Sequence, residues 1–278
     1  MNIKIVVDSC CEIPSMWRDL VHRAANQVDI DDATYIDDNS LNLRGYLTAL
    51  KGMRVFKTAC PGPQDFLSLY EGDEHVVVIA ASSNLSGSYQ CALVAREMYF
   101  EAHGEHKTIY VMDSFSASAG QTAILARLME LREEAADITE VVSELETFRG
   151  EHKIMFVLQS LATLAKSGRV NPVIAKAAEV LGIRCIMSGT SDGKIELTQK
   201  IVGEKRCFRE LAKQISAAAS FAGRTLCISH CDGRDRVDAF LKDLAECMDI
   251  QSFKNILINH TGAVTSLYAG FGGIVVSI

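Results

Sequence analysis

Residues 76–81 (VVVIAA) form an unbroken apolar run that is rich in β-branched side chains and has no polar–apolar alternation. This pattern is typical of a strand that is buried on both faces, as in a parallel sheet. The run leads into a polar segment, residues 82–89 (SSNLSGSY), after which apolar side chains recur at helical spacing. A buried strand, a short polar loop and a helix in succession predict an α/β fold.

The polar segment contains Ser82, Ser83, Ser86 and Ser88. Hydroxyl donors, free backbone N–H groups and the positive end of a helix dipole meet where such a strand leads into a helix. The segment therefore predicts a binding site for a carboxylate or a phosphate. The same residues also suit an ordinary loop in which Asn84 or Ser86 caps the helix, and the sequence leaves that interpretation open.

Short apolar runs and helical patterns alternate along the rest of the chain. The expected strands are residues 3–7, 55–58, 76–81, 108–112, 154–158, 183–187, 195–200, 225–229, 253–258 and a last one in the glycine-rich tail 262–278. The expected helices are residues 119–135, 139–149, 161–166, a segment beginning at 171–172, 204–218 and 234–248. The Asp-Gly pair at 192–193 predicts a β-hairpin between two of the strands.

A chain of 278 residues is long enough for two domains, each with its own core. The charged segment 149–153 (RGEHK) is the best linker signal. We therefore expect an N-terminal α/β domain with a parallel sheet at residues 1–150. A C-terminal domain with mixed α+β strands is expected at residues 151–278.

The charge balance limits the classes of partner. The chain has 28 basic and 35 acidic residues and a net charge of −7, which argues against nucleic acid or an anionic membrane surface as main partner. No apolar run approaches the roughly 20 residues of a membrane-spanning helix, so we expect no stable membrane insertion. Nine cysteines, with no tripartite leader before the first strand, indicate a reducing compartment, and we expect the cytoplasm.

Metal and cofactor motifs are incomplete. Cys227, His230 and Cys231 are spaced like part of a metal site, but three ligands fall short of one, so we expect buried structural cysteines and no metal. The first strand is not followed by the glycine motif of dinucleotide sites, and a P-loop pattern is absent from the sequence. We expect no cofactor.

Several motifs together resemble the DegV family of bacterial fatty-acid-binding proteins. In order along the chain they are residues 7–9 (VDS), 57–61 (KTACP), 82–89 (SSNLSGSY), 113–114 (DS), 166–170 (KSGRV), 192–194 (DGK) and 259–262 (NHTG). The resemblance implies a two-domain α/β DegV-like fold with a long-chain fatty acid in a tunnel between the domains.

The resemblance also implies site residues. It assigns Thr58 and Ser83, with their neighbour Ser82, to the carboxylate contacts, and Ser86 of the same loop is included in the predicted ligand-binding set. His260 matches a histidine near the head group. This assignment predicts a fatty acid as the only ligand and no catalytic residue.

A protein partner follows from the same resemblance. Some relatives present the bound acyl group to a fatty acid kinase, whose catalytic subunit phosphorylates the carboxylate. Arg169 lies in the motif that is near the docking surface in those relatives.

Departures from the family motifs affect the head-group region. Ala59 and Cys60 replace Ser-Gln, and Ala263 and Val264 follow Gly262 where the family has Gly-Pro-Gly. We therefore expect the class of ligand to be kept and the head-group geometry to differ.

Two other functions stay open. A serine hydrolase or acyltransferase would use Ser83 or Ser86 as nucleophile, although residues 84–88 (NLSGS) lack the leading glycine of a nucleophile elbow. Such an enzyme would use a catalytic triad of Ser86, His260 and Asp113. A binder of another small carboxylate or of a phosphorylated metabolite is the other alternative.

Overall fold

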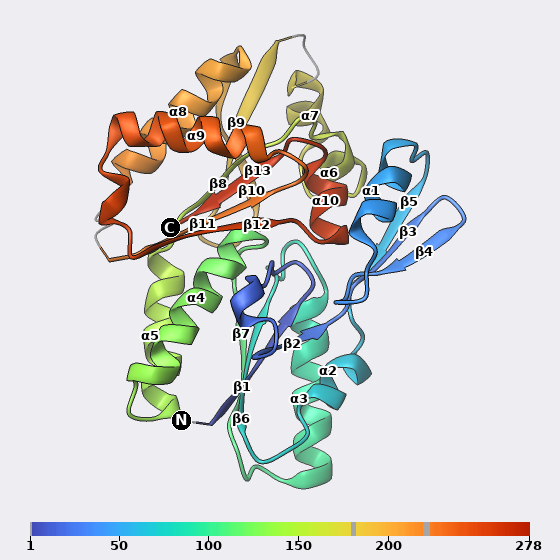
Figure 1. Ribbon diagram of the computed structural model, residues 1–278. Helices are drawn as coiled ribbons and strands as arrows, with labels where there is room; N and C mark the ends of the chain where they lie inside the picture. Colours follow the sequence, from blue (N-terminus) through green and yellow to red (C-terminus); the bar gives the residue numbers. More distant parts are fainter. Residues whose placement is uncertain (1, 179–181, 219–222) are drawn as a thin grey trace.

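The computed structural model describes residues 2–178, 182–218 and 223–278, and three sheets organise them (Figure 1). The first sheet is wholly parallel, with the order β2 (Val21–Ala24), β1 (Ile3–Asp8), β6 (His75–Ala80) and β7 (Ile109–Asp113). Its central strands are buried on both faces, as the unbroken β-branched runs predict.

Helices cover both faces of this first sheet. On one face, Val6, Val76 and Val78 pack with α2 (Pro63–Leu69) and α3 (Ser88–His103). On the other face, Ile5 and Val77 pack with α4 (Ala119–Glu134) and α5 (Ile138–Glu151). Successive residues of one strand therefore supply two separate cores.

The second sheet is mixed and has six strands. Their order is β10 (Ile195–Val202), β9 (Ile183–Gly189), β8 (Ile154–Val157), β13 (Ile274–Ser277), β11 (Thr225–His230) and β12 (Asn255–His260). Only β11 and β12 run parallel as a neighbouring pair. α8 (Glu204–Ala217) and α9 (Arg234–Cys247) cover one face, while α4, α6 (Ala162–Lys166) and α7 (Pro172–Ala178) contribute to the other. The antiparallel pairing of β9 with β10 confirms the predicted hairpin.

A third, small antiparallel sheet projects beside the other two (Figure 1). Its order is β4 (Ala33–Ile36), β3 (Gln27–Ile30) and β5 (Phe56–Ala59), and it packs with α1 (Leu43–Lys51) and α10 (Ala263–Ala269). Sequence patterns predicted only the strand near residues 55–58. Two short 3-10 turns, Ser15–Trp17 and Ile250–Ser252, complete the described elements.

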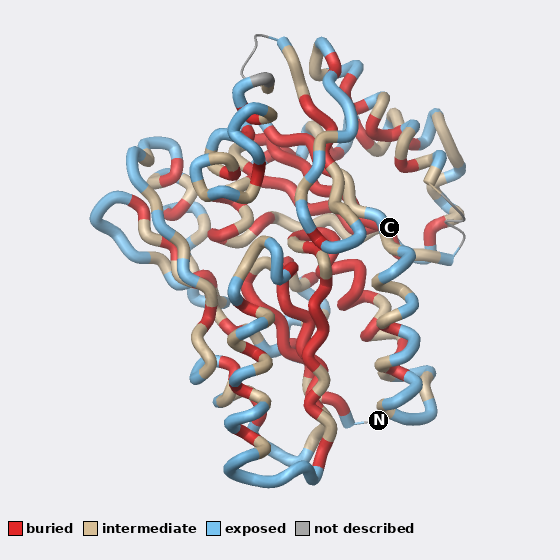
Figure 2. Tube along the Cα trace, turned by 180° about the vertical axis from the view of Figure 1, so that it is seen from behind, coloured by how far each residue is buried: buried red, intermediate tan, exposed pale blue. Residues whose placement is uncertain are grey.

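Helix α4 lies between the two large sheets. Ile124 and Leu128 belong to the core beneath the first sheet, whereas Ala119 and Ala123 belong to the core beneath the second. Figure 2 shows burial concentrated along the strands of both sheets and on the segments between them. None of the helices in the described ranges is both long and apolar enough to cross a membrane.

The predicted domain boundary after residue 150 falls in the last turn of α5, and the first strand of the second sheet begins at Ile154. The change from one sheet to the next thus occurs near that boundary. α10, from the C-terminal part of the chain, packs with β3 and α1 of the N-terminal part. The division into domains 1–150 and 151–278 stays a prediction.

The β9–β10 turn is attached to the loop that follows β6. Ser82 Oγ donates a hydrogen bond to the Gly193 carbonyl at 2.8 Å, and Asn84 Nδ2 donates to the Asp192 carbonyl at 2.6 Å. Gly193 has φ +79°, and a Cβ there would lie 2.3 Å from Ser82 Oγ and 2.7 Å from Phe115 Cα. This contact therefore requires glycine at residue 193.

A buried carboxyl group connects the first sheet, α4 and the second sheet. Glu12 Oε2 accepts hydrogen bonds from Ser118 Oγ at 2.9 Å and from Ser229 Oγ at 2.8 Å. Burial raises the pKa of Glu12 to about 7, against the opposing effect of the Ser229, Ser118 and Thr265 hydroxyls. The protonated side chain is therefore the form that this interior favours.

Replacing Gly193 by alanine tests the attachment of the turn. We expect Gly193→Ala to lower the free energy of unfolding by about 2–4 kcal/mol, because it adds a steric clash to left-handed backbone strain. The control is Gly203→Ala, where φ is +90° but nothing lies within 4 Å of the added Cβ, so only the strain of about 1–2 kcal/mol applies. Equal losses in urea unfolding of the two variants would contradict the packing described for the turn.

The raised pKa of Glu12 predicts a pH dependence of stability. At pH values between the ordinary pKa of 4.5 and the folded value of about 7, folding is accompanied by uptake of a proton at Glu12. The contribution of this proton to stability is therefore complete below pH 4.5 and is lost as the pH rises through about 7. We expect a loss of roughly 3 kcal/mol in the native protein that Glu12→Gln does not share. Urea unfolding of both proteins from about pH 5 to about pH 9 measures the difference, and parallel profiles would refute the assignment.

Candidate functional site

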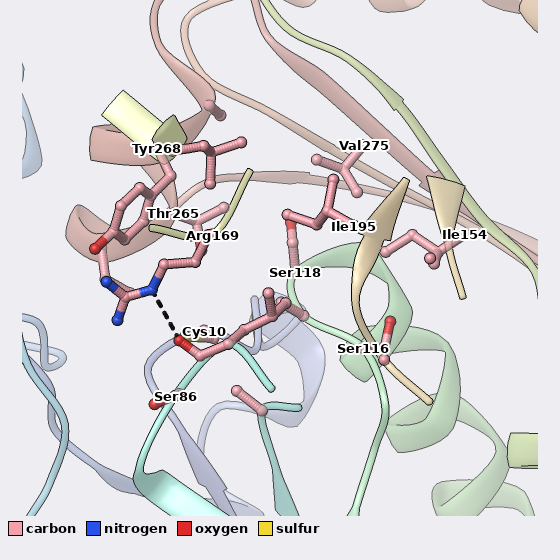
Figure 3. A pocket seen from close by; sticks show the side chains of 18 of the residues that line it. Cys10, Ser86, Ser116, Ser118, Ile154, Arg169, Ile195, Thr265, Tyr268 and Val275 are labelled. Atoms are coloured by element: carbon pink, nitrogen blue, oxygen red, sulfur yellow. Dashed lines mark hydrogen bonds between the residues drawn. The ribbon is translucent and has the colours of Figure 1, made fainter. Parts of the chain in front are cut away.

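A cavity of about 380 Å³ lies where the three sheets meet (Figure 3). Its lining comes from the end of β5, the loops after β6 and β7, the β8–β9–β10 part of the second sheet, and α10. The carboxyl ends of parallel strands are the usual place for ligands in α/β proteins, and β6 and β7 both end at this cavity. The fold therefore puts the polar strand-end loops beside an apolar sheet surface.

One part of the cavity is apolar. Ile154 from β8, Ile195 from β10 and Val275 from β13 line it together in Figure 3. Phe156 and Leu158 extend the same surface and belong to the buried core between the second sheet and α4. These side chains are apolar and suit a hydrocarbon chain, and Ser116, Ser118 and Lys194 line the cavity as well.

The opposite part carries the polar groups. Thr58 Oγ1 and the Tyr268 hydroxyl are 3.0 Å apart and share a hydrogen bond. Arg169 Nε donates to the Leu85 carbonyl at 3.1 Å, the bond drawn in Figure 3, and its guanidinium lies 5.8 Å from the centre of the Tyr268 ring. Ser86, next to Leu85, also lines the cavity. Two hydroxyls, a serine and a guanidinium thus face one end of the space, where an anion would be held by charge-assisted hydrogen bonds.

Buried carboxylates shape the loops around this polar end. Asp8 accepts hydrogen bonds from the backbone N–H of Ala81 and of Cys10 and from Gln121 Nε2. Its pKa is raised by burial, although the three hydrogen bonds act in the opposite direction. Asp113 accepts from the backbone N–H of Ser83 at 3.2 Å. The acidic residues at the strand ends therefore fix backbone rather than bind a ligand.

The predicted ligand-binding residues are not all in one place. Thr58 and Ser86 line the cavity. Ser82 is buried and donates its hydroxyl to the β9–β10 turn, while Ser83 is exposed and donates its backbone N–H to Asp113. His260 Nε2 accepts from the Asp232 backbone N–H, and its ring lies 5.1 Å from that of His230. The ligand-binding role of each stays a prediction.

The polar loop also bonds to the first residue of the helix that follows it. α3 begins at Ser88 with Gly87 as N-cap, and Ser86 Oγ accepts from the Ser88 backbone N–H at 3.3 Å. The N-cap is thus Gly87 and not Asn84 or Ser86. Gly87 and Ser86 also line the cavity, and the anion-binding interpretation of the loop stays a prediction.

Arg169 was predicted near a docking surface, and its side chain lines the cavity. Its guanidinium also donates to the Ser167 carbonyl at 2.7 Å, which closes the turn after α6. A role of Arg169 in docking a partner stays a prediction.

The hypothetical triad residues bond to different partners within the described ranges. Ser86 Oγ shares a hydrogen bond with Ser88 Oγ, and Asp113 accepts from the backbone of Ser83 and Phe115. His260 Nδ1 faces the Thr261 carbonyl. Among the same described residues, no group of three or more His, Cys, Asp or Glu side chains could hold a metal ion.

Sequence reasoning missed the contribution of α10. Val264, Thr265, Tyr268 and Ala269 line the cavity from one side of this helix. Their spacing of one, three and one residues is that of a single helical face and could have identified them. The glycines at both ends of the segment hid this signal in an apparently irregular tail.

Nearly the whole chain matches a known protein family. The family model described as "Uncharacterised protein, DegV family" matches residues 2–278. A DegV domain-containing protein of Streptococcus gordonii is 29% identical over 286 residues, which cover 99% of this chain and 98% of the relative.

Solved structures are similar over the whole chain. A DegV family protein of Ruminococcus gnavus with vaccenic acid has 31% identity, a TM-score of 0.94 and coverage of 100% of both chains. A DegV family protein of Eubacterium eligens loaded with heptadecanoic acid has 28% identity and a TM-score of 0.90, covering 99% of this chain and 98% of the other. The fatty acid kinase (Fak) B3 protein of Streptococcus pneumoniae loaded with linoleic acid has 25% identity and a TM-score of 0.91, covering 100% and 99%. The resemblance seen in the motifs is confirmed, and the chain belongs to the DegV family.

Proposed function

We propose that this protein binds a long-chain fatty acid in the cavity between the sheets. The carboxylate lies at the end lined by Thr58, Tyr268 and Arg169, and the acyl chain lies along Ile154, Ile195 and Val275. The observation that carries the proposal is a cavity lined both by apolar side chains of the second sheet and by Thr58, Tyr268 and Arg169. Its volume of about 380 Å³ is within the roughly 300–1,000 Å³ of small-molecule sites.

Affinity in this proposal comes mainly from the acyl chain. Each buried methylene contributes about 0.8 kcal/mol, so a chain of about sixteen carbons gains on the order of 10 kcal/mol before ordering costs. The carboxylate contributes position, because an ionised group enters a cavity only where hydrogen bonds or an opposite charge replace its water. Thr58 and Arg169 offer both, and Ser86 adds a hydroxyl nearby.

The site set predicted from the family resemblance is thereby refined. The cavity lining supports Thr58 and Ser86 and adds Tyr268 and Arg169. Ser82 acts in the proposal by fixing the β9–β10 turn over the cavity.

We further infer that the bound acid is presented to a fatty acid kinase in the cytoplasm. A relative that is named as a fatty acid kinase B protein and was loaded with linoleic acid supports this partner. Arg169 would then contact the head group and lie beside the docked kinase. Nine cysteines that are free thiols support a reducing compartment.

Removing the Thr58 hydroxyl tests the head-group end. We expect Thr58→Val to weaken binding of a long-chain fatty acid by about 1.5–3 kcal/mol, roughly tenfold to a hundredfold, because a hydrogen bond to a charged group is lost. Thr34→Val is the matched control, since Thr34 is an exposed residue of β4 in the same sheet. Calorimetric titration of delipidated protein measures both, and an unchanged affinity in Thr58→Val would exclude the proposed orientation.

A charge in the apolar part tests the acyl end. Ile195→Asp places a carboxylate against the acyl chain and should lower affinity by more than about tenfold. Val202→Asp is the control, because Val202 is on the same strand and is 68% exposed. Equal affinities of the two variants would show that the ligand lies elsewhere.

The two alternative functions, an acyl-transferring enzyme and a binder of another small ligand, predict different results with the same purified protein. An activated acyl ester leaves a covalent mass increase on Ser83 or Ser86 only if the protein is an acyl-transferring enzyme. A short carboxylate or a phosphorylated metabolite that binds as tightly as a long-chain acid would favour the other alternative.

A further inference from the structure

Two cysteines from separate segments meet at the N-terminus of α3. Cys60 follows the last residue of β5, and Cys91 lies in the first turn of α3. Cys60 Sγ is 2.9 Å from the position that a Cβ on Gly87 would occupy. The Cys91 backbone N–H donates to the Gly87 carbonyl at 3.0 Å. Gly87 is therefore the common neighbour of both cysteines.

The geometry of the helix brings the two thiols together. Side chains of a helix lean toward its N-terminus, so Cys91, four residues after Gly87, points back over that glycine. Gly87 has no side chain, and the sulfur of Cys60 fills the space that one would take. Burial raises the pKa of Cys91, and the neighbouring Cys60 thiol raises it further as a charge and hydrogen-bond partner.

We propose that Cys60 and Cys91 form a redox-active dithiol at the mouth of the cavity, which hydroperoxides oxidise to an intramolecular disulfide and whose oxidation is slowed by a bound ligand. Both thiols are half-buried, so a small oxidant reaches them. Cys60 also lines the cavity. The second half of the proposal rests on the proposed fatty-acid binding, whereas the disulfide itself does not.

Cys60 is the attacking thiol in this reaction. Cys60 lines the cavity, whereas burial raises the pKa of the Cys91 thiol. The Cys60 thiolate attacks one oxygen of the hydroperoxide, the O–O bond breaks, and an alcohol leaves, or water if the oxidant is hydrogen peroxide; Cys60 becomes a sulfenic acid. Cys91 then attacks the Cys60 sulfur, the S–O bond breaks and water leaves with the proton. In total, two thiols lose two protons and two electrons. The hydroperoxide takes up these protons and electrons and becomes an alcohol and water.

Five of the other cysteines are buried, while Cys10 is half-buried and lines the cavity as Cys60 does. Cys207 is on α8 and is buried against one face of the second sheet, whereas Cys185 on β9 is buried in the core on the other face. Cys11, Cys227 and Cys231 are buried as well. Of the remaining half-buried cysteines, Cys247 is on α9 and offers a matched control.

The experiment uses the reduced full-length protein with hydrogen peroxide as the probe. We expect the wild-type protein to lose the mass of two hydrogen atoms, with Cys60 and Cys91 joined in one peptide pair, and a dithiol reductant to restore the original mass. Cys247→Ser should behave like the wild type. Cys91→Ser should instead accumulate a sulfenic acid at Cys60 that dimedone traps. Circular dichroism before oxidation confirms that each variant is folded.

Some results would overturn the proposal. The disulfide is excluded if the wild type gains oxygen at Cys60 without a cross-link, or if the cross-link joins other cysteines. Slower oxidation of Cys60 with a saturating long-chain fatty acid supports the coupling to ligand, and an unchanged rate with the acid shown by calorimetry to be bound refutes it. Failure of the acid to bind contradicts the proposed function instead, and the disulfide is still decided by the protein without ligand.

Discussion

Burial of α4 on two sides holds the two large sheets together, and the rest of the structure depends on it. Large side chains such as Ile124 and Leu128 pack beneath the first sheet, while Ala119 and Ala123 let the second sheet approach closely. Because α4 starts directly after the loop that follows β7, this packing brings the strand-end loops against the second sheet. The cavity is the space left where those loops, with their polar groups, meet an apolar sheet surface.

Sequence patterns predicted the strands and turns whose conformation depends on neighbouring residues in the chain. The β-branched run of β6 and the Asp-Gly turn between β9 and β10 are confirmed, since each is determined by neighbouring residues. Strands β3 and β4 of the small third sheet were missed because they are short and β4 is largely exposed. α10 was missed because glycines enclose seven residues without polar alternation.

The candidate site was only partly predictable from the sequence, because distant contacts determine what its polar side chains bind. Thr58 and Ser86 line the cavity, but the hydroxyl of Ser82 bonds to Gly193, a residue 111 positions away in the chain. A serine in a strand-end loop can bond to a ligand or to a distant backbone carbonyl, and only the tertiary contact distinguishes these. Arg169 was likewise identified by its motif, whereas its position in the lining depends on the turn after α6.

The proposed function combines an apolar surface for affinity with a single polar end for orientation. Native mass spectrometry of protein purified from a bacterial host tests most directly whether this cavity takes up a long-chain acid. We expect one long-chain fatty acid per chain, released by organic extraction and regained when the acid is added back. A protein that emerges without ligand and takes up no added long-chain acid would contradict the proposed function.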